Sequence, residues 1–211
     1  MKKIVIWGCG GHAREVNHLC DQLKYEVIGF LDERPEMKGR IVNDIPVLGD
    51  LHDITSLKKQ ISIVCTGVGD PALKKRFVTK TKAAGFEIAE SIIHPSVYIS
   101  KRNTIGIGSI ICEGAIITTN VHIGNFVIIN RSSNISHDNI INDYVTIAPG
   151  VTIAGNVTIE EGAYIGIGSS IREKINIGPW SIIGGGAFVK NDIPGKTLYA
   201  GVPAKFKKDL N

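Results

Sequence analysis

A six-residue spacing of isoleucines runs through the second half of this sequence and limits what the chain can fold into. Isoleucine occupies every sixth position from Ile93 to Ile183, and the next step falls on Val189. On an α-helix, successive members of this series would lie roughly 240° apart, so no single face could collect them. Short strands separated by turns can collect them, and a six-residue period is typical of a parallel β-helix.

A second position in each hexapeptide supports the same interpretation. The residue four after the isoleucine is often small or β-branched, and it shares the isoleucine's face because strand side chains alternate. A single short strand of this kind cannot bury its apolar face, whereas stacked coils can. Residues at this position include Val97, Ser109, Ala115, Val121, Val127, Val145, Val151, Val157, Ala163, Ser169 and Ala187.

Composition excludes several classes of protein. The chain has 211 residues, of which 43% are hydrophobic, which is enough for one or two packed domains. Its net charge of +4 is mild and scattered, so we expect no nucleic-acid partner. The four cysteines lack metal-ligand spacing, which predicts reduced thiols in a cytoplasmic protein and no metal site. We expect no membrane insertion, because no apolar run is long enough to span a bilayer.

The chain divides near residue 92, and we expect one domain over 1–92 and a second over 93–211. Strands that alternate with helices in the first domain predict a parallel, Rossmann-like α/β sheet with a ligand crevice at the strands' carboxyl ends. The expected strands are Lys3–Trp7, Tyr25–Leu31, Ser62–Thr66 and Phe86–Ile92. The expected helices are Ala13–Leu23, Asp50–Lys59 and Pro71–Ala84.

The first motif with chemical content is GCGGHARE, from Gly8 to Glu15. Glycines after a strand let backbone N–H groups approach a phosphate at a helix N-terminus, and Asp32 ends the second expected strand, where ribose hydroxyls are usually held. A plain turn entering a helix would show the same pattern, and His12 is either a solvated loop residue or a contact to phosphate or sugar. About 90 residues favour one nucleotide over a dinucleotide, which needs two nucleotide-binding halves.

The second motif is SHD, from Ser136 to Asp138, inside the repeat. His137 and Asp138 stand outside the inward positions, and a lone outward histidine is usually surface decoration. An adjacent carboxylate raises the basicity of an imidazole and fixes its tautomer, which is what a general base near neutral pH needs. The three histidines of the repeat, His94, His122 and His137, stand at different positions of the hexapeptide, which argues against a three-histidine zinc site.

With these motifs in place, the whole chain resembles the hexapeptide-repeat acyltransferases that have an N-terminal nucleotide-binding domain. This group contains sugar-nucleotide N-acetyltransferases and sialic acid O-acetyltransferases. The matching stretches follow in order over nearly all of the sequence. They are GCGGHARE, FLDE (30–33), IPVLGD (45–50), TG (66–67), SHD, APG (148–150), AGNVTI (154–159), GIGSSI (166–171), IGGGAFVKND (183–192) and AGVPAK (200–205).

The resemblance implies a fold and an assembly. The second domain would be a left-handed parallel β-helix with three hexapeptides per coil, each coil rising about 4.8 Å. The protein would form a homotrimer with active sites at the interfaces between subunits. An outward-facing His137 would then be closed over by a neighbouring subunit.

The resemblance also implies roles for individual residues. His137 matches the family's general base and Asp138 its acidic partner, where relatives often have Glu. Some relatives have a second histidine at the position of Thr146, so an ionisable role is lost there. The positions that match contacts to acetyl-CoA are Thr146, Gly155, Ile167 and Gly185, and Lys205 would reach its phosphates. The positions that match contacts to a nucleotide sugar are Gly10, Gly11, His12, Asp32 and Gly67.

Several alternatives stay open at this point. Gly155, Gly166 and Gly185 could serve only tight corners that need a positive φ. The leading function is an acetyl-CoA-dependent N-acetyltransferase acting on a UDP- or GDP-linked amino-deoxy sugar for surface glycans. The first alternative is an O-acetyltransferase of sialic acid or a related sugar, and the second is a non-catalytic trimeric scaffold that binds a nucleotide sugar. A small dehydrogenase fits poorly, because a second nucleotide-binding half is missing.

Overall fold

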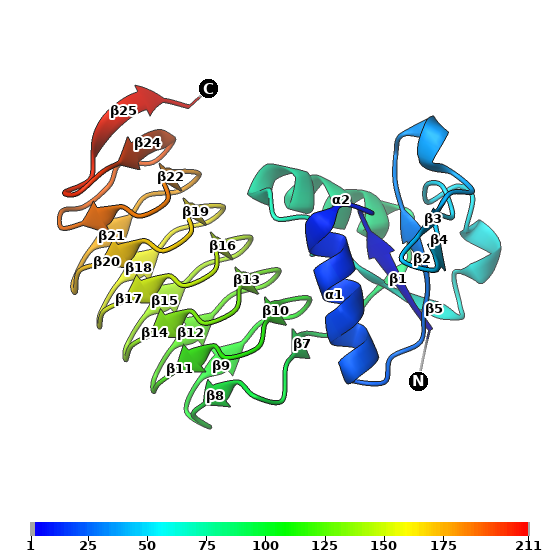
Figure 1. The fold of residues 1–211 in the computed structure, drawn as a ribbon, viewed down its shortest axis with the longest axis horizontal. Helices are drawn as coiled ribbons and strands as arrows, with labels where there is room; N and C mark the ends of the chain where they lie inside the picture. The colour runs from blue at the N-terminus through cyan, green and yellow to red at the C-terminus, as the bar shows by residue number, and fades with distance from the viewer. Residues whose placement is uncertain (1–2, 211) are drawn as a thin grey trace. The chain divides into compact units, whose positions relative to one another are not determined.

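The structure is a computed structural model that describes residues 3–210 of the chain. The chain forms two compact units, Met1–Glu90 and Ser91–Asn211. The first unit is an α/β domain and the second is a β-solenoid of about six turns. Figure 1 shows the short strands of successive turns stacked along the second unit.

The first unit is built on a four-stranded parallel sheet in the order β2-β1-β5-β6. Its elements largely confirm the alternation of strands and helices expected from the sequence. The strands are β1 (Lys3–Trp7), β2 (Val27–Leu31), β5 (Ile61–Val64) and β6 (Glu87–Ile88), and the helices are α1 (Gly11–Gln22) and α2 (Pro71–Ala83). Between β2 and β5 lie the single turn η1 (Pro35–Met37) and the hairpin of β3 (Ile41–Val42) and β4 (Ile45–Pro46).

Two of the sequence predictions for this unit are wrong. The helix expected over Asp50–Lys59 is a series of turns with one 3₁₀ turn, η2 (Thr55–Leu57). Asp50 Oδ1 accepts from the His52 N–H and Asp53 Oδ2 accepts from the Asp50 N–H, and such side-chain bonds compete with helical hydrogen bonding. The single strand expected over Phe86–Ile92 is two strands, β6 and β7, which belong to different units.

The two helices begin differently. Asp70 caps α2, with its Oδ1 accepting from the Leu73 N–H at 2.7 Å, and Pro71 occupies the first turn. Helix α1 begins directly after Gly10 with no side-chain cap. The first N–H groups of α1 are therefore not satisfied by a capping side chain.

The second unit consists of three sheets, whose strands are two residues long and parallel except for the last two strands of the first sheet, which are longer and pair antiparallel. Ile110 pairs with Ile92 on one side and with Ile128 on the other, so neighbours in a sheet are 18 residues apart in sequence. The first sheet contains β7 (Ile92–Ile93), β10 (Ile110–Ile111), β13 (Ile128–Ile129), β16 (Thr146–Ile147), β19 (Tyr164–Ile165) and β22 (Ile182–Ile183), followed by β24 (Thr197–Ala200) and β25 (Lys205–Asp209). The second contains β8 (Tyr98–Ile99), β11 (Ile116–Ile117), β14 (Asn134–Ile135), β17 (Thr152–Ile153), β20 (Ser170–Ile171) and β23 (Phe188–Val189). The third contains β9 (Thr104–Ile105), β12 (His122–Ile123), β15 (Ile140–Ile141), β18 (Thr158–Ile159) and β21 (Asn176–Ile177).

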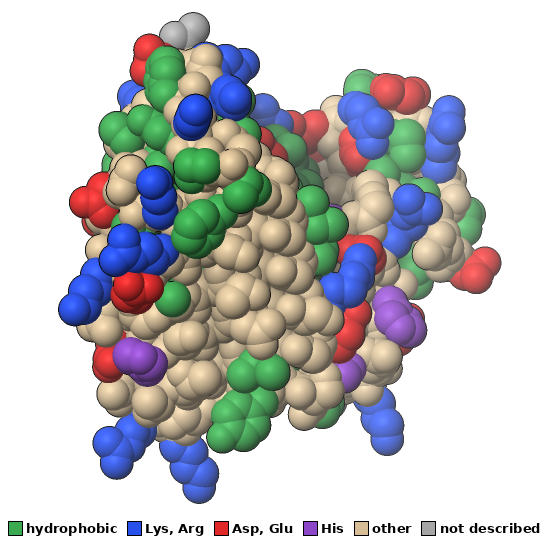
Figure 2. Space-filling view, turned by 60° about the vertical axis from the view of Figure 1, so that its left-hand side comes forward, with side chains coloured by type: hydrophobic (Ala, Val, Ile, Leu, Met, Phe, Trp, Pro, Cys, Tyr) green, Lys and Arg blue, Asp and Glu red, His purple; other side chains and the backbone are tan. Residues whose placement is uncertain are grey.

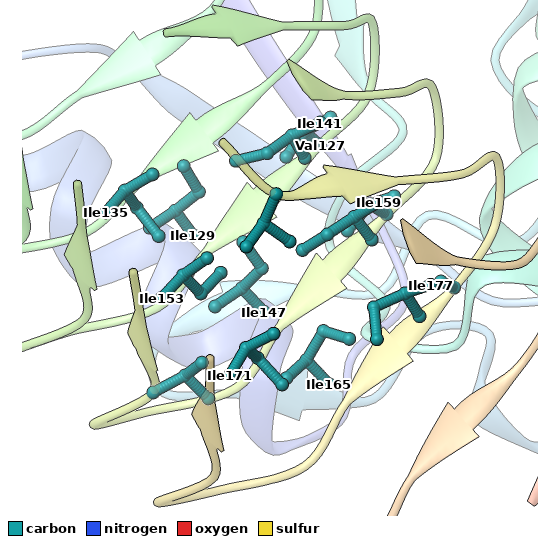
Figure 3. Packing of buried hydrophobic residues seen from close by; sticks show 14 of the residues in the cluster. Val127, Ile129, Ile135, Ile141, Ile147, Ile153, Ile159, Ile165, Ile171 and Ile177 are labelled. Atoms are coloured by element: carbon teal, nitrogen blue, oxygen red, sulfur yellow. The ribbon is translucent and has the colours of Figure 1, made fainter. Parts of the chain in front are cut away.

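The isoleucines of the six-residue series fill the interior of this unit, as the sequence predicted. Figure 3 shows them in three columns, one for each sheet, with Ile129, Ile147 and Ile165 forming one of the columns. These three side chains have no exposed surface, and Val127, at the second inward position, is equally buried. The core is therefore a stack of layers, and each layer is packed between the coils before and after it.

Each coil turns at residues in the left-handed region of backbone conformation. Asn120, Asp138, Asn156 and Lys174 have φ values of 57°, 58°, 58° and 59° and occupy the same corner of successive coils. Asn and Asp adopt this conformation more readily than other residues with a β-carbon. In the part of the chain that the structure describes, no helix is long and apolar enough to cross a membrane.

Candidate active site

The SHD motif lies at one corner of the β-helix, directly after β14. The Asp138 N–H donates to the Thr119 carbonyl at 3.1 Å, and the Asn156 N–H donates to the His137 carbonyl at 3.0 Å. The corner is thus tied by backbone hydrogen bonds to the same corner of the coils before and after it. This holds the main chain of His137 and Asp138 in place while their side chains project outward.

His137 and Asp138 form a hydrogen-bonded pair. His137 Nδ1 lies 2.7 Å from Asp138 Oδ2, and the two side chains are 56% and 43% exposed. The hydrogen bond from His137, followed by one from Asn120, lowers the pKa of Asp138 below its ordinary value. An ionised carboxylate can only accept, so the proton in this contact is on Nδ1, and Nε2 is left as a base.

Gly155 provides the surface against which the His137 ring lies. A β-carbon at position 155 would be only 2.5 Å from Cε1 and 2.6 Å from Nε2 of His137. Gly155 does not have a positive φ, and neither do Gly166 and Gly185. The alternative that these glycines serve corners with a positive φ is therefore wrong, and at position 155 the requirement is space for the imidazole.

A second corner of the β-helix brings together other residues expected to contact acetyl-CoA. A β-carbon at Gly185 would lie 3.1 Å from Cγ2 of Ile167, whose side chain is 62% exposed. Lys205 pairs with Ala200 in the β24–β25 hairpin, and Ala200 packs against Gly184. Ile167 and Gly185 therefore meet at the corner that follows β19 and β22, and Lys205 lies in the hairpin that packs next to Gly184.

The structure does not bring all the expected residues of the β-helix together. His137 and Gly155 follow strands of the second sheet, whereas Ile167 and Gly185 follow strands of the first. Thr146 lies in the first sheet on β16 and is only 2% exposed. Within one chain, the histidine and the Ile167 corner are thus on different edges of the β-helix.

In the first unit, glycines allow the loops that follow β1 and β5 to approach each other closely. A β-carbon at Gly67 would lie 2.1 Å from the Trp7 carbonyl oxygen, and Gly8 has a φ of 90°. A β-carbon at Gly10 would meet nothing within 4 Å, and one at Gly11 would meet only Arg14, at 3.9 Å. Gly67 is required by the packing, whereas Gly10 and Gly11 leave open the approach to the uncapped start of α1.

His12 is largely buried, so the interpretation as a solvated loop histidine is wrong. Its side chain is 18% exposed, and Nδ1 lies 3.7 Å from Glu15 Oε2. Burial lowers the pKa of His12 below its ordinary value. Within the described residues its Nε2 is buried without a hydrogen-bond partner, which is unusual for a polar atom.

Asp32 has an environment that the sequence did not predict. Its Oδ1 accepts from the Arg34 backbone N–H and Nε, and its Oδ2 accepts from Arg34 NH2 and Cys9 Sγ. The Arg34 hydrogen bonds are the main reason that the pKa of Asp32 falls to about 2, while burial and Asp32 raise the pKa of Cys9 to about 11. A carboxylate offers about four lone-pair positions, so these four donors leave Asp32 no free acceptor position while Arg34 stays in place.

The first unit also contains a cavity of about 490 Å³, a volume in the range of small-molecule sites. None of the five expected nucleotide-sugar residues lines it, although Glu33, the neighbour of Asp32, does. Glu33 is held there by ion pairs to Arg76 and Lys80. The other residues that line the cavity are Trp7, Asp50, Leu51, His52, Thr55, Lys80, Ala83, Ala84 and Phe86.

Asn120, whose Nδ2 donates to Asp138 Oδ1 at 3.0 Å, was not among the residues predicted from the sequence. The signal was present, because Asn120 stands 18 residues before Asp138, which is one full coil of three hexapeptides. Among the described residues, no group of three or more His, Cys, Asp or Glu side chains is arranged to hold a metal ion.

Comparison with known proteins connects both units to enzymes. Residues 3–81 match the family of the PglD N-terminal domain. The chain is 33% identical over 189 residues to a GDP-perosamine N-acetyltransferase from Escherichia coli O157:H7, covering 86% of this chain and 82% of that protein.

Among the solved structures that share the whole fold are two with CoA or acetyl-CoA bound. One is a histidine-to-asparagine variant of perosamine N-acetyltransferase from Caulobacter crescentus, in complex with CoA and GDP-perosamine. It has a TM-score of 0.90 and 30% identity, and the match covers 99% of this chain and 98% of that one. The other is the acetyltransferase domain of PglB from Neisseria gonorrhoeae FA1090, in complex with acetyl coenzyme A, with a TM-score of 0.88, 32% identity, and coverage of 98% and 99%.

Proposed function

Because the chain belongs to the family of hexapeptide-repeat sugar acetyltransferases with an N-terminal PglD domain, we propose that it transfers the acetyl group of acetyl-CoA to an amine. The acceptor is the amino group of a nucleotide-linked amino-deoxy sugar used for surface glycans. The observation that best supports this function is the outward-facing His137, hydrogen-bonded to Asp138 at 2.7 Å and lying against Gly155.

The proposed reaction is direct transfer without an acyl-enzyme. His137 Nε2 takes a proton from the sugar amine as the amine nitrogen attacks the thioester carbon of acetyl-CoA. The C–S bond then breaks, CoA leaves as the thiol with a proton returned by His137, and the nitrogen keeps the acetyl group as an amide. Asp138 holds the imidazole in the tautomer needed for the first step and stabilises the imidazolium that forms.

Acetyl-CoA would lie along the β-helix in contact with the Ile167 corner. Ile167 offers an exposed apolar side chain, Gly185 a close approach to backbone, and Lys205 a cation for the phosphates. Thr146 is too buried for a large contact and would at most donate its hydroxyl. Gly155 would meet the acetyl end of the molecule, beside the imidazole.

The separation of His137 from the Ile167 corner supports a homotrimer, in which one subunit's histidine faces the acetyl-CoA corner of its neighbour. Exposed apolar residues on the outer faces also favour assembly: Tyr98 and Ile116 are paired on neighbouring strands and are 68% and 42% exposed. Figure 2 shows a face of the β-helix made mainly of backbone and uncharged polar side chains, with the charged side chains toward its margins. Such a surface can be buried against another copy without desolvating many charges.

The nucleotide sugar would bind the first unit. Gly10 and Gly11 would let its diphosphate reach the start of α1, and His12 Nε2 would gain the partner that it lacks. Asp32 would accept a ribose hydroxyl once the Arg34 side chain moves away, with Gly67 keeping the neighbouring loop close to β1. Two relatives named for GDP-perosamine favour a GDP-linked 4-amino sugar over a UDP-linked one. The four free cysteines are in keeping with a cytoplasmic enzyme.

The decisive experiment measures CoA thiol release from acetyl-CoA with GDP-, UDP- and dTDP-linked 4-amino sugars, with free sialic acid alongside. We expect rapid release with one amino-sugar nucleotide and loss of release in His137→Ala, whose fold and acetyl-CoA binding should survive. Release with sialic acid alone would establish the O-acetyltransferase instead. No release with any acceptor would favour the non-catalytic scaffold.

A further inference from the structure

Asn120 occupies the same corner as Asp138, one coil earlier. The two residues have φ values of 57° and 58°, and the backbone hydrogen bond from the Asp138 N–H to the Thr119 carbonyl joins their coils at this point. Their side chains therefore project from stacked positions on a rigid ladder. The Asn120 Nδ2 donates to Asp138 Oδ1 at 3.0 Å.

The orientation of the Asn120 amide follows from its surroundings. Thr119 Oγ1 donates to Asn120 Oδ1 at 3.4 Å, which leaves the amide nitrogen on the side of Asp138. The opposite orientation would place two acceptor oxygens, Asn120 Oδ1 and Asp138 Oδ1, against each other. Asn120 is thus a donor to the carboxylate.

This contact determines how the Asp138 carboxylate is turned. One oxygen accepts from Asn120 and the other faces His137 Nδ1 at 2.7 Å, so the two hydrogen bonds fix the plane of the carboxylate from opposite sides. The groups that act on this carboxylate are the His137 imidazole and the Asn120 amide. Without Asn120, a 43% exposed carboxylate would rotate freely about its terminal bond and would hold the imidazole only part of the time.

We propose that Asn120 is a positioning residue of the acetyl transfer, acting through Asp138 to keep the His137 imidazole oriented for proton removal. The proposal rests on the proposed function, because it assigns the orientation of that function's base. In this role Asn120 acts through Asp138 and needs no contact of its own with either substrate.

A purely structural role for Asn120 is the competing explanation, since Asn is favoured at a corner with a positive φ. Two substitutions separate the explanations. Asn120→Gly removes the amide and keeps a residue suited to this backbone conformation. Asn120→Asp keeps the size and the turn preference but replaces the donor by an acceptor that repels Asp138.

We expect kcat of Asn120→Gly to fall roughly three- to tenfold, with the KM of both substrates little changed, because a hydrogen bond that acts only on the base affects the chemical step. Asn120→Asp should be slower than Asn120→Gly. The control is Lys174→Gly, at the same corner two coils beyond Asp138 with a φ of 59°, which should retain wild-type kinetics. An Asn120→Asp enzyme with wild-type kcat, or losses confined to KM, would overturn the proposal.

A second measurement does not depend on turnover. The Asp138 carboxyl carbon can be followed by NMR against pH in protein with labelled aspartate, with Asp138→Asn giving the assignment. Because the Asn120 hydrogen bond contributes to the lowered pKa of Asp138, Asn120→Gly should raise that pKa toward its ordinary value. If the pKa of Asp138 were the same in Asn120→Gly as in the wild type, the contact between Asn120 and Asp138 would be overturned. A wild-type protein that releases no CoA would overturn both the function and this role, whereas an active wild type with an unaffected Asn120→Asp variant would overturn only the role.

Discussion

The imidazole of His137 lies directly against the backbone of Gly155 on the next coil. All three nearest atoms to a β-carbon built at position 155 belong to this ring, at 2.5, 2.6 and 3.0 Å. Real β-carbons do not approach other atoms so closely, so any side chain at this position must displace the ring. Glycine is therefore required at position 155 by the space that the His137 imidazole occupies and not by the conformation of the turn.

Gly155→Ala should move the imidazole and lower kcat/KM by about 10²-fold, the loss expected when a reacting group is misplaced by about 1 Å. Thermal stability should change little, because Gly155 does not have a positive φ. The matched test is a double-mutant cycle with His137→Ala, measured by the residual rate of CoA release at high enzyme concentration. In the His137→Ala background, Gly155→Ala should cost nothing further; an equal loss in both backgrounds would mean that the glycine acts independently of the ring.

Ile147 and Ile167 offer a comparison within one residue type. Ile147→Ala removes a side chain with no exposed surface and should lower the free energy of unfolding by about 2–5 kcal/mol. Ile167→Ala, at a side chain that is 62% exposed, should leave stability nearly unchanged and raise the KM for acetyl-CoA. Urea unfolding and steady-state kinetics on both variants check this, and an unchanged KM in Ile167→Ala would remove that residue from the acetyl-CoA site.

Arg34→Ala should strengthen nucleotide binding. Arg34 supplies three of the four donors that occupy Asp32, so its removal frees acceptor positions for ribose hydroxyls. Because the Arg34 backbone N–H remains in the variant, two of those positions become free. Isothermal titration with GDP and UDP should give a lower Kd for Arg34→Ala and a higher one for Asp32→Ala. A higher Kd for Arg34→Ala would instead show that the guanidinium contacts the nucleotide.

The ion pair between Asp32 and Arg34 also predicts how the free energy of unfolding depends on pH. The pKa of Asp32 is about 2 in the folded chain, against about 4 when unfolded, so the ionised form is favoured by folding. Its contribution is fully present above about pH 4 and is lost as the pH falls toward 2. Arg34→Ala should therefore be less stable than the wild type at pH 7, with the difference shrinking between pH 4 and 2.

Helical ellipticity during urea unfolding measures this difference, because α1 and α2 both lie in the first unit. Lys3→Ala is a suitable comparison. It removes another surface ion pair, to Glu26, without touching Asp32. A stability difference for Arg34→Ala that stayed constant from pH 7 to 2 would contradict the assignment to Asp32.

The β-helix was predictable from sequence because one periodic signal fixes strand, face and pairing partner together. The isoleucines of this series, such as Ile147, are inward where the period places them, and the parallel pairing follows from it. The segment Asp50–Lys59 was predicted wrongly because its helix-like composition competes with side-chain bonds from Asp50 and Asp53, which no periodicity reveals.

In the candidate sites, only contacts between residues of one local sequence motif could be predicted. His137 and Asp138 are neighbours in sequence, so their hydrogen bond could be expected. The contacts of Asn120 and Gly155 cross from one coil to the next, and they become visible only when the chain is read at a spacing of 18 residues. The occupation of Asp32 by Arg34 is a matter of side-chain conformation, which a sequence motif does not record.

The parallel pairing of each strand with the strand 18 residues away has a consequence for how this protein can change in length. Deleting one residue from a coil would turn every later isoleucine away from the interior and separate Asn120 from Asp138, or His137 from Gly155, depending on where it falls. Inserting a whole coil beyond Gly185 would leave all of those neighbours in place and only move the C-terminal hairpin further along the axis. During evolution, the length of this β-helix is therefore expected to change by whole coils. Single inserted residues are expected only in loops that project outward at the corners.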